Sequence, residues 1–173
     1  MQQESRWIVE VGDLVLSRAV RRNHALEHAT VTLLARRIPA LNVSARSSAR
    51  GFTIFADLDA DLVRACADEA LARLRDGETW LAIHPNCGTN LAVGTSFAVA
   101  GSMWGFLSPR ARTRILSLML STVAGIAVAR PLGYTAQRLF TTSTDVEHVR
   151  IIDVRRKRFA RKHVVEVLTQ ARA

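Results

Sequence analysis

The spacing of hydrophobic positions changes along this 173-residue chain and divides it into a compact module, an uncharged stretch and a tail. In the module, apolar positions recur at helical spacing in two segments, and three other short segments are typical of strands. The predicted order is a helix over 13–38, strands over 41–45 and 51–56, a helix over 59–76 and a strand over 79–83. Pro39 ends the first helix, Asp59 caps the second and Gly77 stops it, while a serine-rich turn joins the first two strands.

The middle of the chain lacks charge in two long runs. Residues 85–109 contain no Asp, Glu, Lys, Arg or His, and a helix of that length reaches ~37 Å, more than the ~30 Å hydrocarbon core of a bilayer. Residues 115–129 are also uncharged, but they span a bilayer only if Arg130 snorkels or the helix continues to about Gln137. We therefore expect a transmembrane hairpin whose first span has the clearer pattern. A soluble pair of Ala/Gly-rich helices is the alternative.

Small residues repeat every four positions in both uncharged runs. They are Gly94, Ala98 and Ser102 in the first and Ser117, Ser121, Gly125 and Ala129 in the second, with Gly101 and Gly105 as a GxxxG pair. Such spacing lets helix backbones approach closely in lipid. The same faces favour packing against a membrane-protein partner or a second copy of the chain.

The tail after residue 138 predicts a strand over 149–154, a basic turn over 155–158 and a strand or short helix over 163–168. This tail is expected to pair as a hairpin with the sheet of the module. The fold class is thus α+β, with an αββαβ module over 1–84 joined to a transmembrane helical hairpin over 85–138 and a basic segment over 139–173.

Composition adds a charge argument. The chain has 24 Lys and Arg against 15 Asp and Glu, a net charge of +9, yet its mean hydropathy is +0.10. Basic residues favour either anionic lipid headgroups or nucleic acid, but the chain has few aromatic residues for base stacking and no nucleic-acid motif, so we expect lipid. Arginines flanking the runs favour a bacterial inner-membrane protein with its module and C-terminus in the cytoplasm. Two cysteines and a start without a signal-peptide pattern agree with that compartment.

The candidate chemistry lies on the first predicted helix. His24 and His28 are four residues apart and Glu27 lies between them, which gives the order H-x-x-E-H. In inverzincins the two histidines of this pattern bind Zn²⁺ and the glutamate is the general base. The three side chains fall on an apolar stripe that also contains Leu34 and Ala35, with Arg21, Arg22, Arg36 and Arg37 largely outside it. Buried ionisable groups are tolerated when they bind a metal or hydrogen-bond to one another, so a structural His/Glu cluster is the alternative.

A zinc site needs a third protein ligand. His84 and Cys87, spaced HxxC before the first uncharged run, are the first and third choices, and Glu69 on the second helix is the second. The segment 84–90 that holds His84 and Cys87 also carries Asn86, Thr89 and Asn90. It either caps the first span, with Asn86 or Thr89 at the N-cap, or forms a second wall of the site that donates hydrogen bonds to a substrate.

Three motifs resemble an uncharacterised bacterial membrane family, a domain of unknown function. They are N-H-A-L-E-H-A-T at 23–30, A-I-H-P-N-C-G-T-N at 82–90 and Q-R-L-F-T-T-S-T-D at 137–145. The resemblance covers most of the chain and implies a membrane protein that carries these polar motifs. It implies no activity.

The H-x-x-E-H helix also resembles, more faintly, that of pitrilysin-type metallopeptidases. This likeness implies that His24 and His28 are zinc ligands, Glu27 the base and Glu69 the counterpart of their distal glutamate ligand. The chain departs from that family because it is far smaller and lacks the paired halves that enclose a peptide.

Two functions follow as hypotheses. The first is a membrane-anchored zinc hydrolase, such as a peptidase, in which Glu27 deprotonates a zinc-bound water. The second is a non-catalytic accessory or assembly subunit of a membrane complex, whose polar cluster is structural or binds a metal or a tetrapyrrole.

Overall fold

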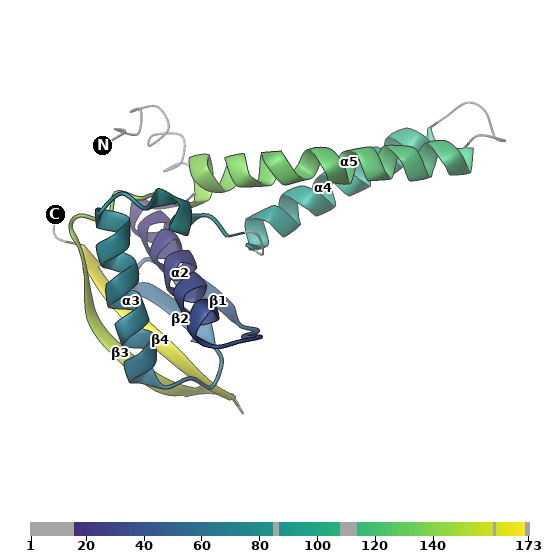
Figure 1. Cartoon of the computed structure of the whole chain (residues 1–173). Helices are drawn as coiled ribbons and strands as arrows, with labels where there is room; N and C mark the ends of the chain where they lie inside the picture. The colour runs from purple at the N-terminus through teal and green to yellow at the C-terminus, as the bar shows by residue number, and fades with distance from the viewer. Residues whose placement is uncertain (1–15, 85–86, 108–113, 161, 172–173) are drawn as a thin grey trace. The chain divides into compact units, whose positions relative to one another are not determined.

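The computed structural model describes residues 16–84, 87–107, 114–160 and 162–171, which divide into two compact units (Figure 1). One unit comprises residues 1–84 and 138–173, and the other comprises 85–137. The C-terminal segment therefore belongs to the same unit as the N-terminal module. We describe each unit in turn.

The first unit is mixed α and β, as the sequence predicts. Its elements in chain order are α2 (Arg18–Arg37), β1 (Ser44–Ser48), β2 (Gly51–Phe55), α3 (Ala60–Arg75), the 3-10 helix η1 (Thr79–Ala82), β3 (Val149–Phe159) and β4 (Lys162–Ala171). The strands form one antiparallel sheet in the order β1-β2-β4-β3. The predicted pairing of the tail with the module is confirmed, because β4 lies beside β2 at the centre of the sheet.

The core of this unit lies between the sheet and the two helices α2 and α3, which pack against each other and against the strands (Figure 1). Fully buried residues from α2, α3 and the sheet fill it, including Leu26, Leu34, Phe52, Val63 and Val165. The predicted cap of α3 is confirmed, since the Asp59 side chain accepts hydrogen bonds from the Asp61 and Leu62 amides.

Three local predictions are wrong. Residues 79–82 form η1 and not a strand, because Leu81 and Ala82 are adjacent and both buried, whereas a strand turns neighbouring side chains to opposite faces. The serines expected in a turn lie within β1, which starts three residues later than predicted. The basic residues 155–158 belong to β3 and not to a turn.

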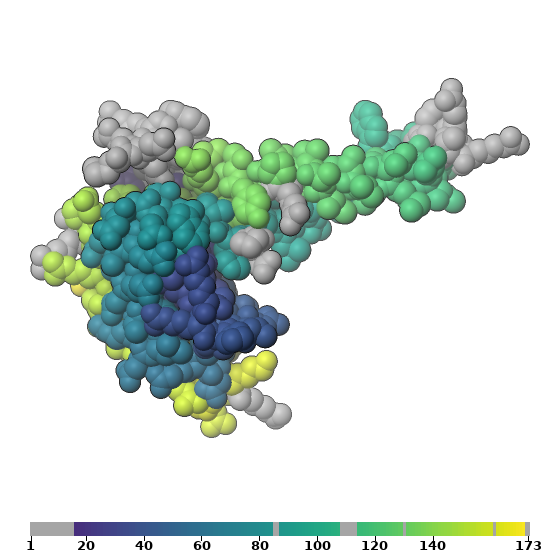
Figure 2. Space-filling model, in the orientation of Figure 1, coloured from purple at the N-terminus to yellow at the C-terminus, as the bar shows by residue number. Residues whose placement is uncertain are grey.

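The second unit consists of α4 (Gly88–Phe106) and α5 (Arg114–Ala136), which contact each other along their length (Figure 2). α5 continues into the π-helical turn η3 (Gln137–Thr141). The two helices meet through small residues: the Ser102 and Thr122 hydroxyls are 2.8 Å apart, and Gly101 and Gly125 lie against the backbone of the facing helix. The predicted close approach at these positions is therefore present within the pair.

Among the described residues, one helix, Arg114–Thr141, is long and apolar enough to cross a membrane. Its most apolar window has a mean hydropathy of 1.7 and is 6% buried. The expectation of two membrane spans is thus not supported. The helix that qualifies contains the second predicted span, whereas the first was expected to have the clearer pattern. α4 lacks charge, but its Gly, Ser, Thr and Asn residues are not apolar, so the absence of charge overstated its hydropathy.

Candidate functional site

The polar residues of the first motif are buried at the centre of the first unit. α2 is enclosed along residues 23–30 because α3, the sheet and η1 all pack against it. Asn23, Glu27 and His28 are 2%, 7% and 4% exposed, and His24 is half-buried. The predicted stripe is slightly misplaced, since Leu33 is buried whereas Ala35 is exposed. The motif therefore lies where α2 has almost no solvent-facing side.

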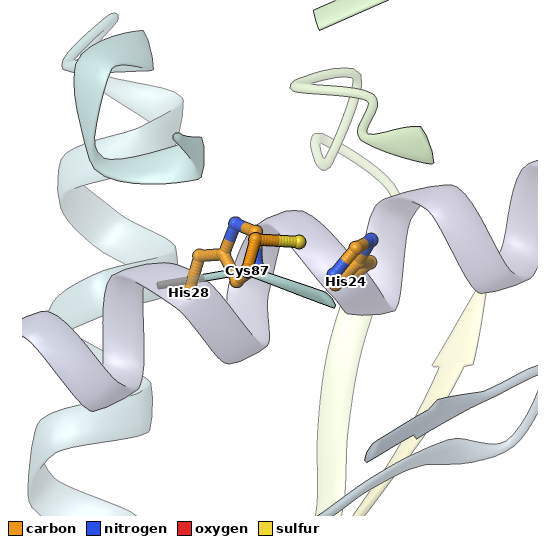
Figure 3. A group of neighbouring side chains, drawn as sticks. All are labelled: His24, His28 and Cys87. Carbon is orange, nitrogen blue, oxygen red and sulfur yellow. The ribbon is translucent and has the colours of Figure 1, made fainter. Parts of the chain in front are cut away.

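His24 and His28 lie on successive turns of α2, with ring centroids 4.3 Å apart (Figure 3). The Nδ1 of His24 is 2.8 Å from the carbonyl oxygen of Thr141, and that of His28 is 2.7 Å from the carbonyl oxygen of Ala82. A carbonyl oxygen can only accept, so each Nδ1 donates its proton. In the neutral rings each Nε2 then presents a lone pair, which is the tautomer that metal-binding histidines adopt when a carbonyl orients them.

The structure brings His84 to this pair. Its ring centroid is 5.8 Å from that of His28, and it follows η1 by two residues. η1 is anchored by the buried Leu81 and Ala82, and the carbonyl group of Ala82 is the one that His28 contacts. The short 3-10 helix, which the sequence did not predict, is therefore what positions His84 beside α2.

Cys87 belongs to the second unit and is the N-cap of α4, where its sulfur accepts a hydrogen bond from the Thr89 amide at 3.4 Å. The predicted caps were Asn86, which lies outside the described residues, and Thr89. Because Cys87 is three residues after His84, the chain keeps their Cα atoms within about 11 Å of each other. A helix N-terminus also stabilises negative charge on a ligand atom such as sulfur.

The two candidate carboxylates lie elsewhere. Glu27 accepts a hydrogen bond from the Ser47 hydroxyl of β1, so its side chain is directed to the sheet. Glu69 pairs with Arg37 and Arg73 at the surface, with its side chain 36% exposed. Within the described part of the chain, neither carboxylate joins the histidines in a metal-ligand group. Cys66 is a fully buried core residue of α3, and burial raises the pKa of its thiol.

Arg21 is a site residue that sequence reasoning missed. It was expected outside the apolar stripe, but it is fully buried, and its guanidinium donates to the carbonyl oxygens of Leu139 (3.1 Å) and Thr142 (3.2 Å). Its own carbonyl oxygen accepts the Ser143 amide at 3.1 Å. With the His24 contact and an ion pair from Arg22 to Asp145, α2 thus holds segment 139–145, which is most of the third sequence motif (137–145).

Asn23, the first residue of the motif at 23–30, links α2 to the sheet. Its amide donates to the Ser48 carbonyl oxygen at 2.8 Å and its oxygen accepts the Thr169 hydroxyl at 2.6 Å. It therefore joins α2 to β1 and β4. The first unit places His24 and His28 between the two segments through which the chain leaves and re-enters it, 82–84 and 138–145.

Comparisons with known proteins match the part of the chain that contains the three motifs. A family model described as domain of unknown function (DUF6391) matches residues 19–154, which include all three motifs. An uncharacterized protein of Picosynechococcus sp. is 38% identical over 137 residues, covering 72% of this chain and 66% of that relative. The chain thus spans just under two thirds of that relative's length. No solved structure matches the chain.

Proposed function

The chain belongs to the DUF6391 family, and we propose that it is a membrane-anchored protein that binds a zinc ion through His24 and His28. The observation that carries the proposal is the pair of Nδ1–H donors held by the Thr141 and Ala82 carbonyl oxygens. These contacts fix both rings and direct proton-free Nε2 atoms away from the backbone. Imidazole nitrogen is a preferred zinc ligand, at about 2.0–2.1 Å.

The third ligand comes from the segment 84–87. His84 is supported by geometry, because its ring centroid lies 5.8 Å from that of His28 within the first unit. Cys87 is supported by its chemistry, because thiolate binds zinc strongly, and by its place three residues after His84 in the chain. Glu69 is the weaker candidate, since a ligand role would require it to leave two arginines.

The anchor is α5, with α4 packed on it. The large apolar side chains of the pair face outward, whereas small residues lie where the two helices meet, the reverse of a soluble helical hairpin. These small residues are Gly101, Ser102, Gly105, Thr122 and Gly125. The exposed residues are Leu91, Val99, Met103, Trp104, Phe106 and Leu107 on or beside α4, and Ile115, Leu116, Met119, Leu120, Val123, Ile126, Val128, Leu132 and Tyr134 on α5. Lipid is the solvent that this surface suits, and arginines on both flanks favour a bacterial inner membrane with the first unit in the cytoplasm.

Hydrolysis, including peptide hydrolysis, is a second candidate. Glu27 is buried next to His28 in sequence, its carboxylate accepts a hydrogen bond from the Ser47 hydroxyl, and a carboxylate is the group that acts as general base in the H-x-x-E-H pattern. A bound zinc ion would supply an activated water. A non-catalytic accessory subunit instead needs only the metal site and the anchor, and the orientation of Glu27 to the sheet favours this simpler role.

Metal analysis of the full chain purified in detergent tests the proposal. We expect about one zinc per chain and less than a tenth of that in His24→Ala and His28→Ala, because each removes one of two preoriented ligands. His148→Ala, an exposed histidine outside the cluster, is the matched control and should keep its zinc. Equal and negligible zinc in all four proteins would contradict the metal site. Glu27→Gln should retain zinc, and loss of casein cleavage in that variant would favour the hydrolase.

The third ligand can be identified with an alkylating reagent. We expect zinc to protect Cys87 from iodoacetamide at least tenfold if its sulfur binds the metal, and to leave its rate unchanged if His84 does. Cys66 is the internal control, because its buried thiol with a raised pKa should stay unmodified in both states. Peptide mass spectrometry after timed labelling measures both sites. Cys87→Ser then loses zinc affinity only in the first case, and His84→Ala only in the second.

A further inference from the structure

The tip of the β3–β4 hairpin combines an exposed aromatic residue with unpaired positive charge. Phe159 is 63% exposed at the end of β3, and Ala160 turns the chain with a φ of 52°. β3 has 11 residues, so the tip lies about 33 Å from Val149 at ~3.3 Å per residue. Val149 lies at the opposite end of β3, where its carbonyl oxygen accepts a hydrogen bond from Arg75 (2.6 Å). The tip is therefore a separate feature of the first unit.

The charges near the tip are of two kinds. Arg155 and Lys157 both pair with Glu166, and Arg156 pairs with Asp57. The hydrogen bonds from Lys157 and then Arg155 hold the pKa of Glu166 below its usual value, so the two pairs to Glu166 persist at neutral pH. Within the described chain, Arg158 and Lys162 have no ion pair, and both are exposed at adjoining ends of the two strands. Their charges remain available to an anionic partner.

An apolar hollow lies beside Lys162. It is lined by Ser44, Phe55, Phe159, Ala160, Lys162 and Val164. The rings of Phe55 and Phe159 meet edge to face, with centroids 5.8 Å apart. This arrangement gives one apolar surface with the Lys162 ammonium group at its rim. Single-stranded nucleic acid instead stacks successive bases on a row of separate aromatic faces, which this hollow lacks.

We propose that this tip is a second membrane contact, in which Phe159 enters the headgroup boundary of an anionic bilayer while Arg158 and Lys162 bind lipid phosphates. The proposal rests on the membrane anchor proposed above, since a tethered unit meets the bilayer at high local concentration. Aromatic rings favour the membrane interface, and long basic side chains extend their charge to phosphates while their stems cover apolar surface. Charge complementarity makes acidic phospholipid the occupant.

The experiment uses the full chain reconstituted in nanodiscs of phosphatidylcholine alone or with phosphatidylglycerol, each with brominated acyl chains. Phe159→Trp reports the tip, and Ile152→Trp, at a position 55% exposed on the same strand, is the matched control. The signal of the native tryptophans is subtracted with the parent protein. We expect bromine to quench the tryptophan introduced at 159 at least threefold more in the anionic discs, and the one at 152 equally in both.

Adding Arg158→Gln and Lys162→Gln to Phe159→Trp should abolish the dependence on phosphatidylglycerol. Equal quenching at positions 159 and 152 in discs that retain the chain overturns the tip contact and leaves the anchor standing. A chain that does not enter the discs overturns both. If instead an RNA oligonucleotide changes the emission at 159 and anionic lipid does not, the tip binds nucleic acid and the lipid proposal is wrong.

Discussion

Replacing Arg21 with alanine is expected to destabilise the first unit by about 3–5 kcal/mol, because the change removes a fully buried charged group and its partners stay buried. The guanidinium donates to the Leu139 and Thr142 carbonyl oxygens, which lose this donor in the variant. The measurement is urea unfolding of the full chain in detergent, with hydrogen exchange of the amides in 139–146 as a local readout. Those amides should lose protection first.

The neighbouring residue supplies the control for Arg21. Arg22→Ala removes a partly exposed ion pair to Asp145 and should cost no more than about 1 kcal/mol. Arg21→Met restores most of the volume without the hydrogen bonds, so it should fall between the two and separate packing from hydrogen bonding. Equal effects of Arg21→Ala and Arg22→Ala would contradict the assignment of Arg21 as the residue that holds segment 139–145.

Sequence reasoning succeeded where the physical cause is local. The cap of α3 depends on Asp59 and the two amides that follow it, and the shared face of His24 and His28 follows from helical spacing alone. The sheet layer was also predictable in outline, because alternating apolar positions indicate strands wherever those strands later pair. Nothing in these features requires knowledge of a distant segment.

Sequence reasoning failed where burial comes from distant parts of the chain. Arg21 looks like a surface residue until segment 139–143, 118 or more positions away, covers it. Residues 79–83 form a short apolar run that resembles a strand, but the sheet is completed by β4 from the C-terminal segment, and residues 79–82 form η1. α4 was overrated as a span because lack of charge was read as hydropathy. A signal for Arg21 did exist, because T-T-S-T-D, the end of the third motif (141–145), is polar and was assigned no partner in the sequence analysis.

Replacing Gly101 or Gly125 with alanine is expected to separate α4 from α5. A Cβ on Gly101 would lie 2.3 Å from the Ser121 carbonyl oxygen, and one on Gly125 would lie 2.4 Å from that of Phe97. Both obstacles are backbone atoms of the facing helix, which cannot rotate away as a side chain can. Each alanine should therefore cost about 1–3 kcal/mol by overpacking, and the double variant more.

Gly94→Ala is the matched control for these variants, because a Cβ at that position on the same helix meets nothing within 4 Å. It adds the same methyl group and should leave stability unchanged or slightly raised, since alanine has the better helix propensity. SDS titration of the chain in mixed micelles, followed by circular dichroism, measures the unfolding midpoint of the helical pair. A midpoint lowered equally by Gly94→Ala and Gly101→Ala would mean that close backbone contact does not stabilise the pair. The small residues would then have to face a partner outside this chain, which is the arrangement that an accessory subunit requires.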